Sequence, residues 1–233
     1  MAEVGEKSVC PLFVAADWRE CSGFVAHWSD VREFRLPVQW AREGVWGGRR
    51  VLAVANGAGS ERAYSAVMAA SDIAGPLSAV CSIGFCGALD GALAIGDVVE
   101  VSEVRSEAGL WATRSGGVSL VSVDHIVATA KEKRALRDTG ASVVEMEAGG
   151  VARAAAELGI PFYCVRAVSD LAEETFANDF AAALGPDGRF SVGRLMWGAM
   201  ANPVARFGEL IRLGRRTALA GKNLGRRLAD SHF

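Results

Sequence analysis

The sequence predicts an α/β fold, a three-layer α/β/α sandwich with a mixed, mostly parallel central sheet. Short apolar runs alternate with segments of helical periodicity along the 233 residues, which is the pattern of β-α-β units. Most of these runs are apolar at nearly every position, as in strands that helices cover on both faces. In such folds ligands bind beyond the carboxyl ends of the strands. We therefore expect the functional site in the segments that follow the strands.

Seven apolar runs are expected to form strands. They lie at residues 11–16, 49–55, 78–83, 97–104, 118–123, 142–146 and 161–168. The run DVVEVSEV alternates apolar and polar residues, which is typical of a strand with one exposed face.

Seven segments with helical periodicity are expected to form helices. They lie at residues 17–28, 59–74, 130–138, 147–158, 171–184, 191–200 and 203–220. In the fourth helix Val151, Ala155 and Leu158 share one face, and Gly159 ends it before the next strand. No internal repeat or low-complexity linker divides the chain. We therefore expect one domain over 1–233, with a basic helical extension from about 186 to 233.

The composition excludes several classes of protein. Hydrophobic residues make up 51% and charged residues 22% of the chain, which argues against disorder. The net charge of −2 excludes an overall polycation, and we expect no nucleic-acid partner. The N-terminus does not resemble a signal peptide, and no stretch approaches the ~20 apolar residues of a membrane span. Five cysteines without a C-x-x-C pair suggest neither disulfides nor a metal site, so we expect a cytoplasmic protein.

Two acidic segments follow expected strands. In VVEMEAGG, Glu145 and Glu147 lie where a strand gives way to a helix. A carboxylate buried there needs hydrogen-bond partners, which a sugar diol would supply, although an exposed helix N-terminus also favours acids. In PFYCVRAVSD, the strand carries Arg166 and ends in Ser169 and Asp170, which would serve equally well as a helix N-cap.

Two glycine-rich segments follow other expected strands. GFCGALDGALAIGD contains Gly84 and Gly87, where the missing side chain lets a ligand approach the backbone, although a plain turn explains them as well. NGAGSER contains Gly57 and Gly59, which could cradle a phosphate or form a tight turn. Glu20 lies early in the first helix and, taken alone, is an ordinary solvated acid.

Together and in this order, these segments resemble the nucleoside phosphorylase and nucleosidase superfamily. Its members include purine nucleoside phosphorylases and methylthioadenosine/S-adenosylhomocysteine nucleosidases. The resemblance extends from about residue 11 to about 172, and its most specific part is VVEMEAGGVARAAAELGIPFYCVRAVSD. GFCGALDGALAIGDVV is similar to the family's G-x-x-G-x-L-x-x-x-L-x-x-G-D motif. The resemblance implies a phosphorylase/hydrolase-like fold and cleavage of the N-glycosidic bond of a purine nucleoside, with adenine as the expected base.

The resemblance assigns roles to three carboxylates. Asp170 matches the acid that protonates the purine at N7, and Glu147 matches the acid that binds the ribose hydroxyls. Glu20 matches the carboxylate that activates water in the nucleosidases. Such groups would stabilise a transition state with positive charge on the ribose and negative charge on the base.

The resemblance also implies a set of substrate-binding residues. They are Phe85, Cys86, Gly87, Ile126, Val127, Glu145, Met146, Arg166 and Ser169. In this assignment Met146 packs under the sugar, Ser169 assists the acid that follows it, and the backbone of 126–127 reads the purine.

The family contains both hydrolases and phosphorylases, and phosphate is the one co-substrate that the resemblance implies; no cofactor is expected. Phosphorylases typically carry an R-x-G-[ST] pattern, whereas residues 82–85 read Ser-Ile-Gly-Phe here. The missing arginine and hydroxyl residue favour hydrolysis. Phe85 also departs from the nucleosidases, in which serine is usual. Candidates for an anion site are Gly57, Gly59, Arg62 and Arg19.

The C-terminal segment is basic. Between 189 and 227 there are nine Arg or Lys residues and one acid, Glu209. Such an amphipathic helix could lie on the inner face of an anionic membrane, or it could present an ordinary solvated basic face.

This tail, together with SVDHIVATAKEKRALRDTGA, resembles the hopanoid-biosynthesis-associated phosphorylases, which are thought to remove adenine from adenosylhopane. That subgroup implies a lipid 5′ substituent and peripheral membrane contact, and the superfamily implies a homo-oligomer. Two alternatives stay open: a methylthioadenosine/S-adenosylhomocysteine nucleosidase, and a non-catalytic nucleoside- or lipid-binding protein.

Overall fold

The computed structural model describes residues 9–200 and 202–231. Its strands are β1 (Cys10–Ala15), β2 (Ser29–Glu33), β3 (Trp40–Trp46), β4 (Arg49–Ala55), β5 (Leu77–Ala88), β6 (Val98–Ser106), β7 (Gly109–Ala112), β8 (Val118–Ser122), β9 (Val143–Glu145) and β10 (Phe162–Asp170). Its helices are α1 (Trp18–Val25), α2 (Ser60–Ala74), α3 (Ala130–Arg137), α4 (Ala148–Leu158), α5 (Phe180–Ala183), α6 (Val192–Ala199) and α7 (Pro203–Ala229).

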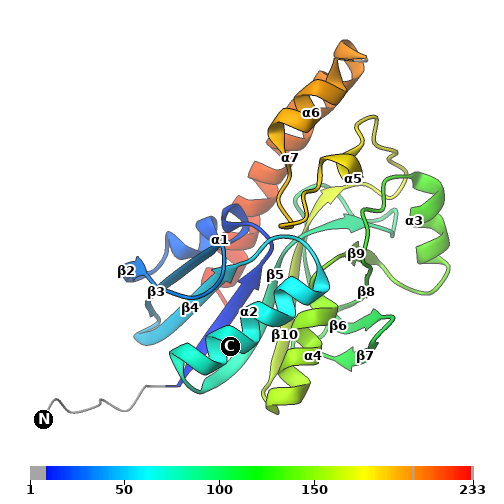
Figure 1. Ribbon diagram of the computed structural model, residues 1–233. Helices are drawn as coiled ribbons and strands as arrows, with labels where there is room; N and C mark the ends of the chain where they lie inside the picture. Colours follow the sequence, from blue (N-terminus) through cyan, green and yellow to red (C-terminus); the bar gives the residue numbers. More distant parts are fainter. Residues whose placement is uncertain (1–8, 201, 232–233) are drawn as a thin grey trace, which may run out of the picture.

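Helices cover both faces of one mixed sheet, which is the predicted three-layer arrangement (Figure 1). The pairings at its centre, β4 with β1, β1 with β5 and β5 with β10, are parallel. Helices α2 and α4 pack together on one face, and α1 and α7 pack together on the other. The carboxyl ends of the central strands therefore meet at one edge of the sheet.

Strand β1 shows why the central runs are apolar throughout. Leu12 and Val14 face the core under α2 and α4, whereas Phe13 and Ala15 face the core under α1 and α7. All four are buried, because successive residues of a strand point to opposite faces and both faces carry helices. Phe13 packs edge-to-face on Phe24 of α1, with ring centroids 4.7 Å apart.

Strand β5 connects the sheet to the site. It is 12 residues long and pairs with β1 and β10, and its end pairs antiparallel with β9, where Gly87 lies opposite Val144. Strands β10, β6, β8, β9 and β5 thereby close into a ring. This closure carries the end of β9 to the ends of β5 and β10.

The helix predicted over 171–184 is wrong, because only Phe180–Ala183 is helical. The Leu171 amide donates to the Glu174 carboxylate at 2.9 Å, and the amides of residues 177 and 178 donate to Glu209 of α7, each at 2.8 Å. Side-chain acceptors thus take the amides that a helix would pair with backbone carbonyls.

The sequence pattern also does not predict β2, β3 or β7. Strand β2 is exposed along its whole length, so it shows no apolar pattern. In β3 the buried Glu43 interrupts the apolar run, and it is neutralised by ion pairs with Arg32 and Arg50. A charged edge strand such as β2, and the strand β3 beside it, carry little hydrophobic signal.

Helix α7 extends nine residues beyond the predicted end at 220, to Ala229. Leu224 and Leu228 are buried in the core that it shares with α1. Gly225 packs directly on Gly23, where an added Cβ would come within 2.4 Å of backbone. The second half of the basic segment is therefore part of the body of the fold.

Gly150 lets α4 approach the start of α2. A Cβ at this position would lie 1.9 Å from the Ser60 carbonyl oxygen, so one helix has to move. Gly150→Ala is expected to lower the free energy of unfolding by about 1–3 kcal/mol, as measured by urea denaturation. Gly208→Ala on α7 is the control, because a Cβ there has no neighbour within 4 Å. Equal destabilisation by both variants would contradict this account.

Candidate active site

A cavity of about 240 Å³ lies where β1, β5, β9 and β10 end. It brings together eleven of the residues selected from the sequence. They are Glu20, Phe85, Cys86, Gly87, Ile126, Val127, Glu145, Met146, Glu147, Ser169 and Asp170. The three carboxylates that the sequence singles out for catalysis thus line one cavity.

Glu20 joins the ends of β1 and β5. Its Oε2 accepts the amides of Ala16 and Asp17 at 2.9 and 3.0 Å, and its Oε1 accepts the Phe85 amide at 2.9 Å. Gly84 makes this approach possible, since its φ is +150° and a Cβ there would lie 2.8 Å from Oε1. Burial raises the pKa of Glu20, and the backbone hydrogen bonds oppose that rise.

Asp170 has a partner on each oxygen. The Ser169 hydroxyl lies 2.7 Å from Oδ1, and the Lys133 ammonium of α3 donates to Oδ2. Lys133 is 1% exposed and also donates to the Leu171 carbonyl at 2.7 Å. No sequence pattern predicts this buried cation, because the charged run KEKR in α3 is typical of a helix exposed to solvent.

Glu147 is the N-cap residue of α4, but its side chain points away from that helix. Its Oε1 accepts the Gly59 amide at 2.9 Å. Burial, reinforced by the nearby carboxylates of Glu145 and Glu20, raises the pKa of Glu147 to about 8. A carboxyl with this pKa is mostly protonated at neutral pH.

Glu145 caps α4 in place of Glu147. Its carboxylate accepts the amides of Glu147 and Ala148, both at 2.9 Å, and pairs with Arg166 at 2.6 Å. Arg166 also donates to the Ser82 hydroxyl at 2.6 Å. The side chains of Glu145 and Arg166 are 2% or less exposed. This buried ion pair lies at the base of the cavity, and the hydrogen bonds of Glu145 to the backbone hold the start of α4 in place.

The remaining wall of the cavity is apolar. Ile126 and Val127 contribute to it, as the sequence predicts, and so do Phe176 and Phe190. The two phenylalanines are linked through Phe180, with ring centroids 5.1 and 6.2 Å apart. They lie between β10 and α6, in a region without a motif, so no sequence signal marks them.

His125 also lines the cavity and was not selected from the sequence. Its ring nitrogens lie 3.0 Å from Asp124 and 2.9 Å from Glu132. The Asp124 hydrogen bond raises the pKa of His125, against the effect of partial burial.

The candidate anion-binding residues lie around the cavity without forming a cationic site. The Gly57 amide donates to the Ala16 carbonyl at 2.9 Å, and the Gly59 amide is occupied by Glu147. The Arg62 guanidinium donates to the Pro186 carbonyl. Arg19 is exposed and pairs with Asp17 at 3.2 Å. Neither arginine lines the cavity.

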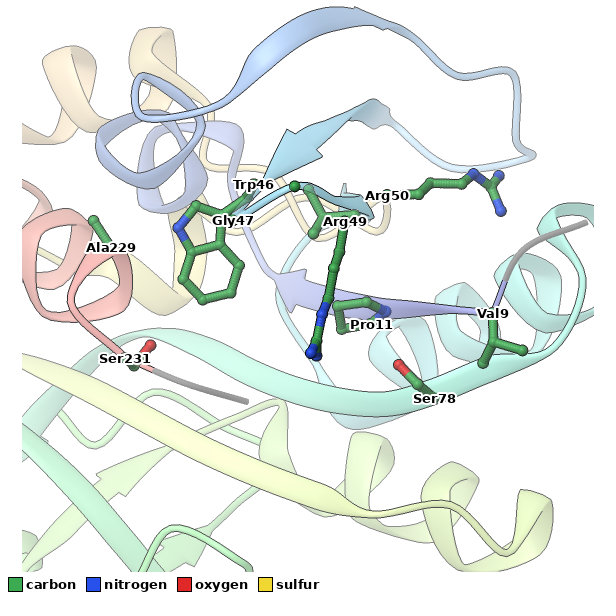
Figure 2. A pocket seen from close by; sticks show the side chains of 11 residues that line it. Val9, Pro11, Trp46, Gly47, Arg49, Arg50, Ser78, Ala229 and Ser231 are labelled. Carbon is green, nitrogen blue, oxygen red and sulfur yellow. The ribbon is translucent and has the colours of Figure 1, made fainter.

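A larger cavity, of about 790 Å³, lies at the opposite edge of the sheet, at the amino ends of β1 and β5 (Figure 2). Pro11, Trp46, Arg49 and Ser78 are among its lining residues. No Asp or Glu of the described chain lines it, so it offers no group for acid–base chemistry. Over 9–200 and 202–231, no cluster of three or more His, Cys, Asp or Glu could hold a metal.

The family model for the phosphorylase superfamily matches residues 106–185, the stretch that contains Glu145, Glu147 and Asp170. Solved structures extend the likeness to the fold of nearly the whole chain, whereas no curated protein matches the sequence.

One similar structure is the 5′-methylthioadenosine/S-adenosylhomocysteine nucleosidase of Neisseria meningitidis in complex with methylthio-immucillin-A. Its sequence is 20% identical and the TM-score is 0.71, and the match covers 95% of this chain and 97% of that one. Another is the futalosine hydrolase of Helicobacter pylori, with 15% identity, a TM-score of 0.71 and 94% of each chain covered. A nucleosidase of S. pneumoniae has 17% identity and the same TM-score, over 95% of this chain and 97% of that one. At these identities the structures show a shared fold.

Proposed function

We propose that this protein cleaves the N-glycosidic bond of a purine nucleoside, with adenine as the base. The proposal depends chiefly on one observation: Glu20, Glu147 and Asp170 face one small cavity that has an apolar wall. The superfamily match of residues 106–185 and the fold shared with nucleosidases support the same chemistry.

Asp170 is the proposed route of a proton to the leaving base. Cleavage leaves the bonding electron pair on the purine, and a proton delivered to N7 neutralises it. The Lys133 ammonium donates a hydrogen bond to one oxygen of Asp170 in a buried ion pair, and the Ser169 hydroxyl orients the other oxygen. In the proposed step Asp170 takes up a proton from solvent when the substrate binds and passes it to N7 of the base, which leaves the Asp170 carboxylate paired with Lys133.

Glu147 and Glu20 are proposed to act on the ribose and the attacking water. When the ribose hydroxyls occupy the site, Glu147 is proposed to release its proton to solvent; the carboxylate then accepts hydrogen bonds from these hydroxyls, and its negative charge stabilises the cationic ribose. Glu20 takes a proton from water as the water oxygen bonds to C1′ of the ribose. The raised pKa of Glu20 suits a base that must accept a proton near neutral pH.

The charges around the cavity favour hydrolysis over phosphorolysis. No Arg or Lys of the described residues lines the cavity, so a phosphate anion would meet Glu20 and Glu147 without a cation. Arg166 is already engaged by Glu145 and by Ser82. An arginine at 82, as in the phosphorylase pattern, would put a second buried cation against Arg166.

The finer substrate proposal is a nucleoside with a bulky apolar 5′ substituent, of which adenosylhopane is the candidate from the sequence resemblance. A groove of about 530 Å³ between α1 and α7 shares Phe85 with the active-site cavity. Small residues such as Gly23, Ala218 and Gly221 line it, together with the basic residues Arg19, Lys222 and Arg226. Phe85, which stands where nucleosidases usually have serine, would form the apolar passage between the two. The alternative is methylthioadenosine or S-adenosylhomocysteine, which the structural likeness supports.

Release of free purine from a panel of nucleosides tests this function. The panel is methylthioadenosine, S-adenosylhomocysteine, adenosine, inosine and a long-chain 5′-alkyl adenosine, each with and without phosphate. We expect adenine release without phosphate, and fastest turnover of the 5′-alkyl compound. Tight binding of these nucleosides with no base release would instead favour a non-catalytic nucleoside-binding protein.

The pKa of Glu147 predicts a pH dependence of stability. Between its ordinary value of 4.5 and about 8 this carboxyl is protonated in the folded protein and ionised in the unfolded one, so unfolding releases a proton. The free energy of unfolding therefore falls as pH rises through this window, by at most about 1.4 kcal/mol per pH unit. Urea denaturation of the wild type and of Glu147→Gln at pH 5 to 8 measures this slope. An equally steep fall in the variant would contradict the assignment.

A further inference from the structure

Helix α6 and the first half of α7 form a hairpin that projects from the body of the fold (Figure 1). Arg206 of α7 donates to the Gly198 carbonyl of α6 at 2.5 Å, which ties the two helices together. Glu209 anchors the base of the hairpin by accepting the amides of residues 177 and 178. The hairpin is therefore a fixed projection whose outer surface faces away from the core.

The outer surface of this hairpin is apolar and exposed. Its large exposed side chains are Val192, Met196, Trp197, Met200, Val204 and Ile211. Trp197 is 81% exposed and Val204 90%. Val192, Met196 and Met200 recur every four residues and so share one face of α6. Large exposed apolar side chains gathered on a projection are typical of an interaction surface.

The exposed charges on the hairpin are all positive. The side chains of Arg194 and Arg215 are exposed, and among the described residues neither is in an ion pair or hydrogen bond. The acid of this segment, Glu209, is 3% exposed and satisfied internally. The surface thus combines apolar side chains, including a tryptophan, with unpaired cations and presents no exposed carboxylate of its own.

We propose that the α6–α7 hairpin docks on the surface of an anionic lipid bilayer. Interfacial helices bury Trp and aliphatic side chains at the headgroup boundary and hold cations against anionic lipid. A second copy of this chain fits the charges less well, because a two-fold contact through this patch would bring Arg194 and Arg215 of each copy towards their like-charged equivalents. No helix of the described chain is long and apolar enough to cross a membrane, so the contact is peripheral.

The hairpin stands next to the active-site cavity. Phe176 and Phe190, which line the cavity, belong to the segment that leads into α6. Docking through the hairpin therefore brings the cavity close to the bilayer, where a nucleoside with a lipid substituent would reside.

Co-sedimentation of the full-length protein with vesicles tests the proposal. Vesicles of phosphatidylcholine alone are compared with vesicles of phosphatidylcholine and phosphatidylglycerol, at low and high salt. We expect binding to the anionic vesicles that weakens with salt. The variant Trp197→Ser/Met200→Ser should reduce binding by about tenfold or more, and Arg194→Gln/Arg215→Gln should remove the preference for anionic lipid.

Leu110→Ser is the matched control, because Leu110 is 58% exposed on β7, away from the hairpin. It should bind vesicles like the wild type, and circular dichroism should show all variants folded. Absence of vesicle binding by the wild type would overturn the proposal, as would unchanged binding of Trp197→Ser/Met200→Ser. A patch variant that converts an oligomer to a monomer, with no vesicle binding by the wild type, would assign the surface to a second copy instead.

Discussion

Replacing Asp170 with asparagine is expected to lower the rate of purine release by about 10²–10⁴-fold. Asparagine has the same shape but cannot deliver a proton to the leaving base, so negative charge would build up on the purine without neutralisation. The Ser169 hydroxyl and the Gly87 backbone, which lie against the carboxylate, remain in place. The measurement is the single-turnover rate of base release, at substrate concentrations that saturate both proteins.

The control for this variant separates chemistry from folding. Asp170→Asn leaves the buried Lys133 without its anionic partner, so the variant should also be less stable. Urea denaturation gives the temperature and pH at which the variant is fully folded, and rates are compared there. A fully folded variant that releases base at the wild-type rate would remove Asp170 from the mechanism.

Replacing Lys133 with methionine is expected to lower the free energy of unfolding by about 3–5 kcal/mol at neutral pH. The change leaves Asp170 as a buried carboxylate without a cation, although its Ser169 contact stays. A buried carboxylate without a counter-charge takes up a proton more readily, so the destabilisation should shrink as pH falls towards 5. Urea denaturation at several pH values measures this trend.

Lys131→Met is the matched control for that experiment. Lys131 lies on the same helix, α3, but its side chain is exposed, so its loss should change stability by less than about 0.5 kcal/mol. The same loss of stability in both variants, or a Lys133→Met effect that is constant with pH, would show that the pair with Asp170 does not set the stability of this region.

The fold follows from local sequence pattern, whereas the candidate catalytic residues come from the order of their segments and the family resemblance that this order carries. The continuous apolar runs of β1, β4, β5 and β10 indicate burial on both faces. The sequence predicts that Gly84 lets a ligand approach the backbone, whereas in the structure the carboxylate of Glu20 lies there. Glu20, Glu147 and Asp170 are each ambiguous alone, since helix caps use the same residues. Their order along the chain selects them, and the ring closure of β5 and β9 explains how distant segments meet.

The rest of the site depends on long-range contacts that leave no local pattern. Lys133 is buried only because α3 packs on the end of β10. Phe176 reaches the cavity because Glu209 of α7, more than 30 residues away, holds the loop beside it. In the sequence Glu209 is simply the one acid of a basic segment. In the structure its side chain is buried and accepts the amides of residues 177 and 178.

A crystal structure of the protein with a non-hydrolysable adenosine analogue tests the central claim most directly. We expect the base to lie against Ile126, Val127 and Phe176, with N7 within hydrogen-bond distance of Asp170 and the ribose hydroxyls hydrogen-bonded to Glu147. An analogue bound in the cavity at the opposite edge of the sheet, or bound with its base away from Asp170, would contradict it.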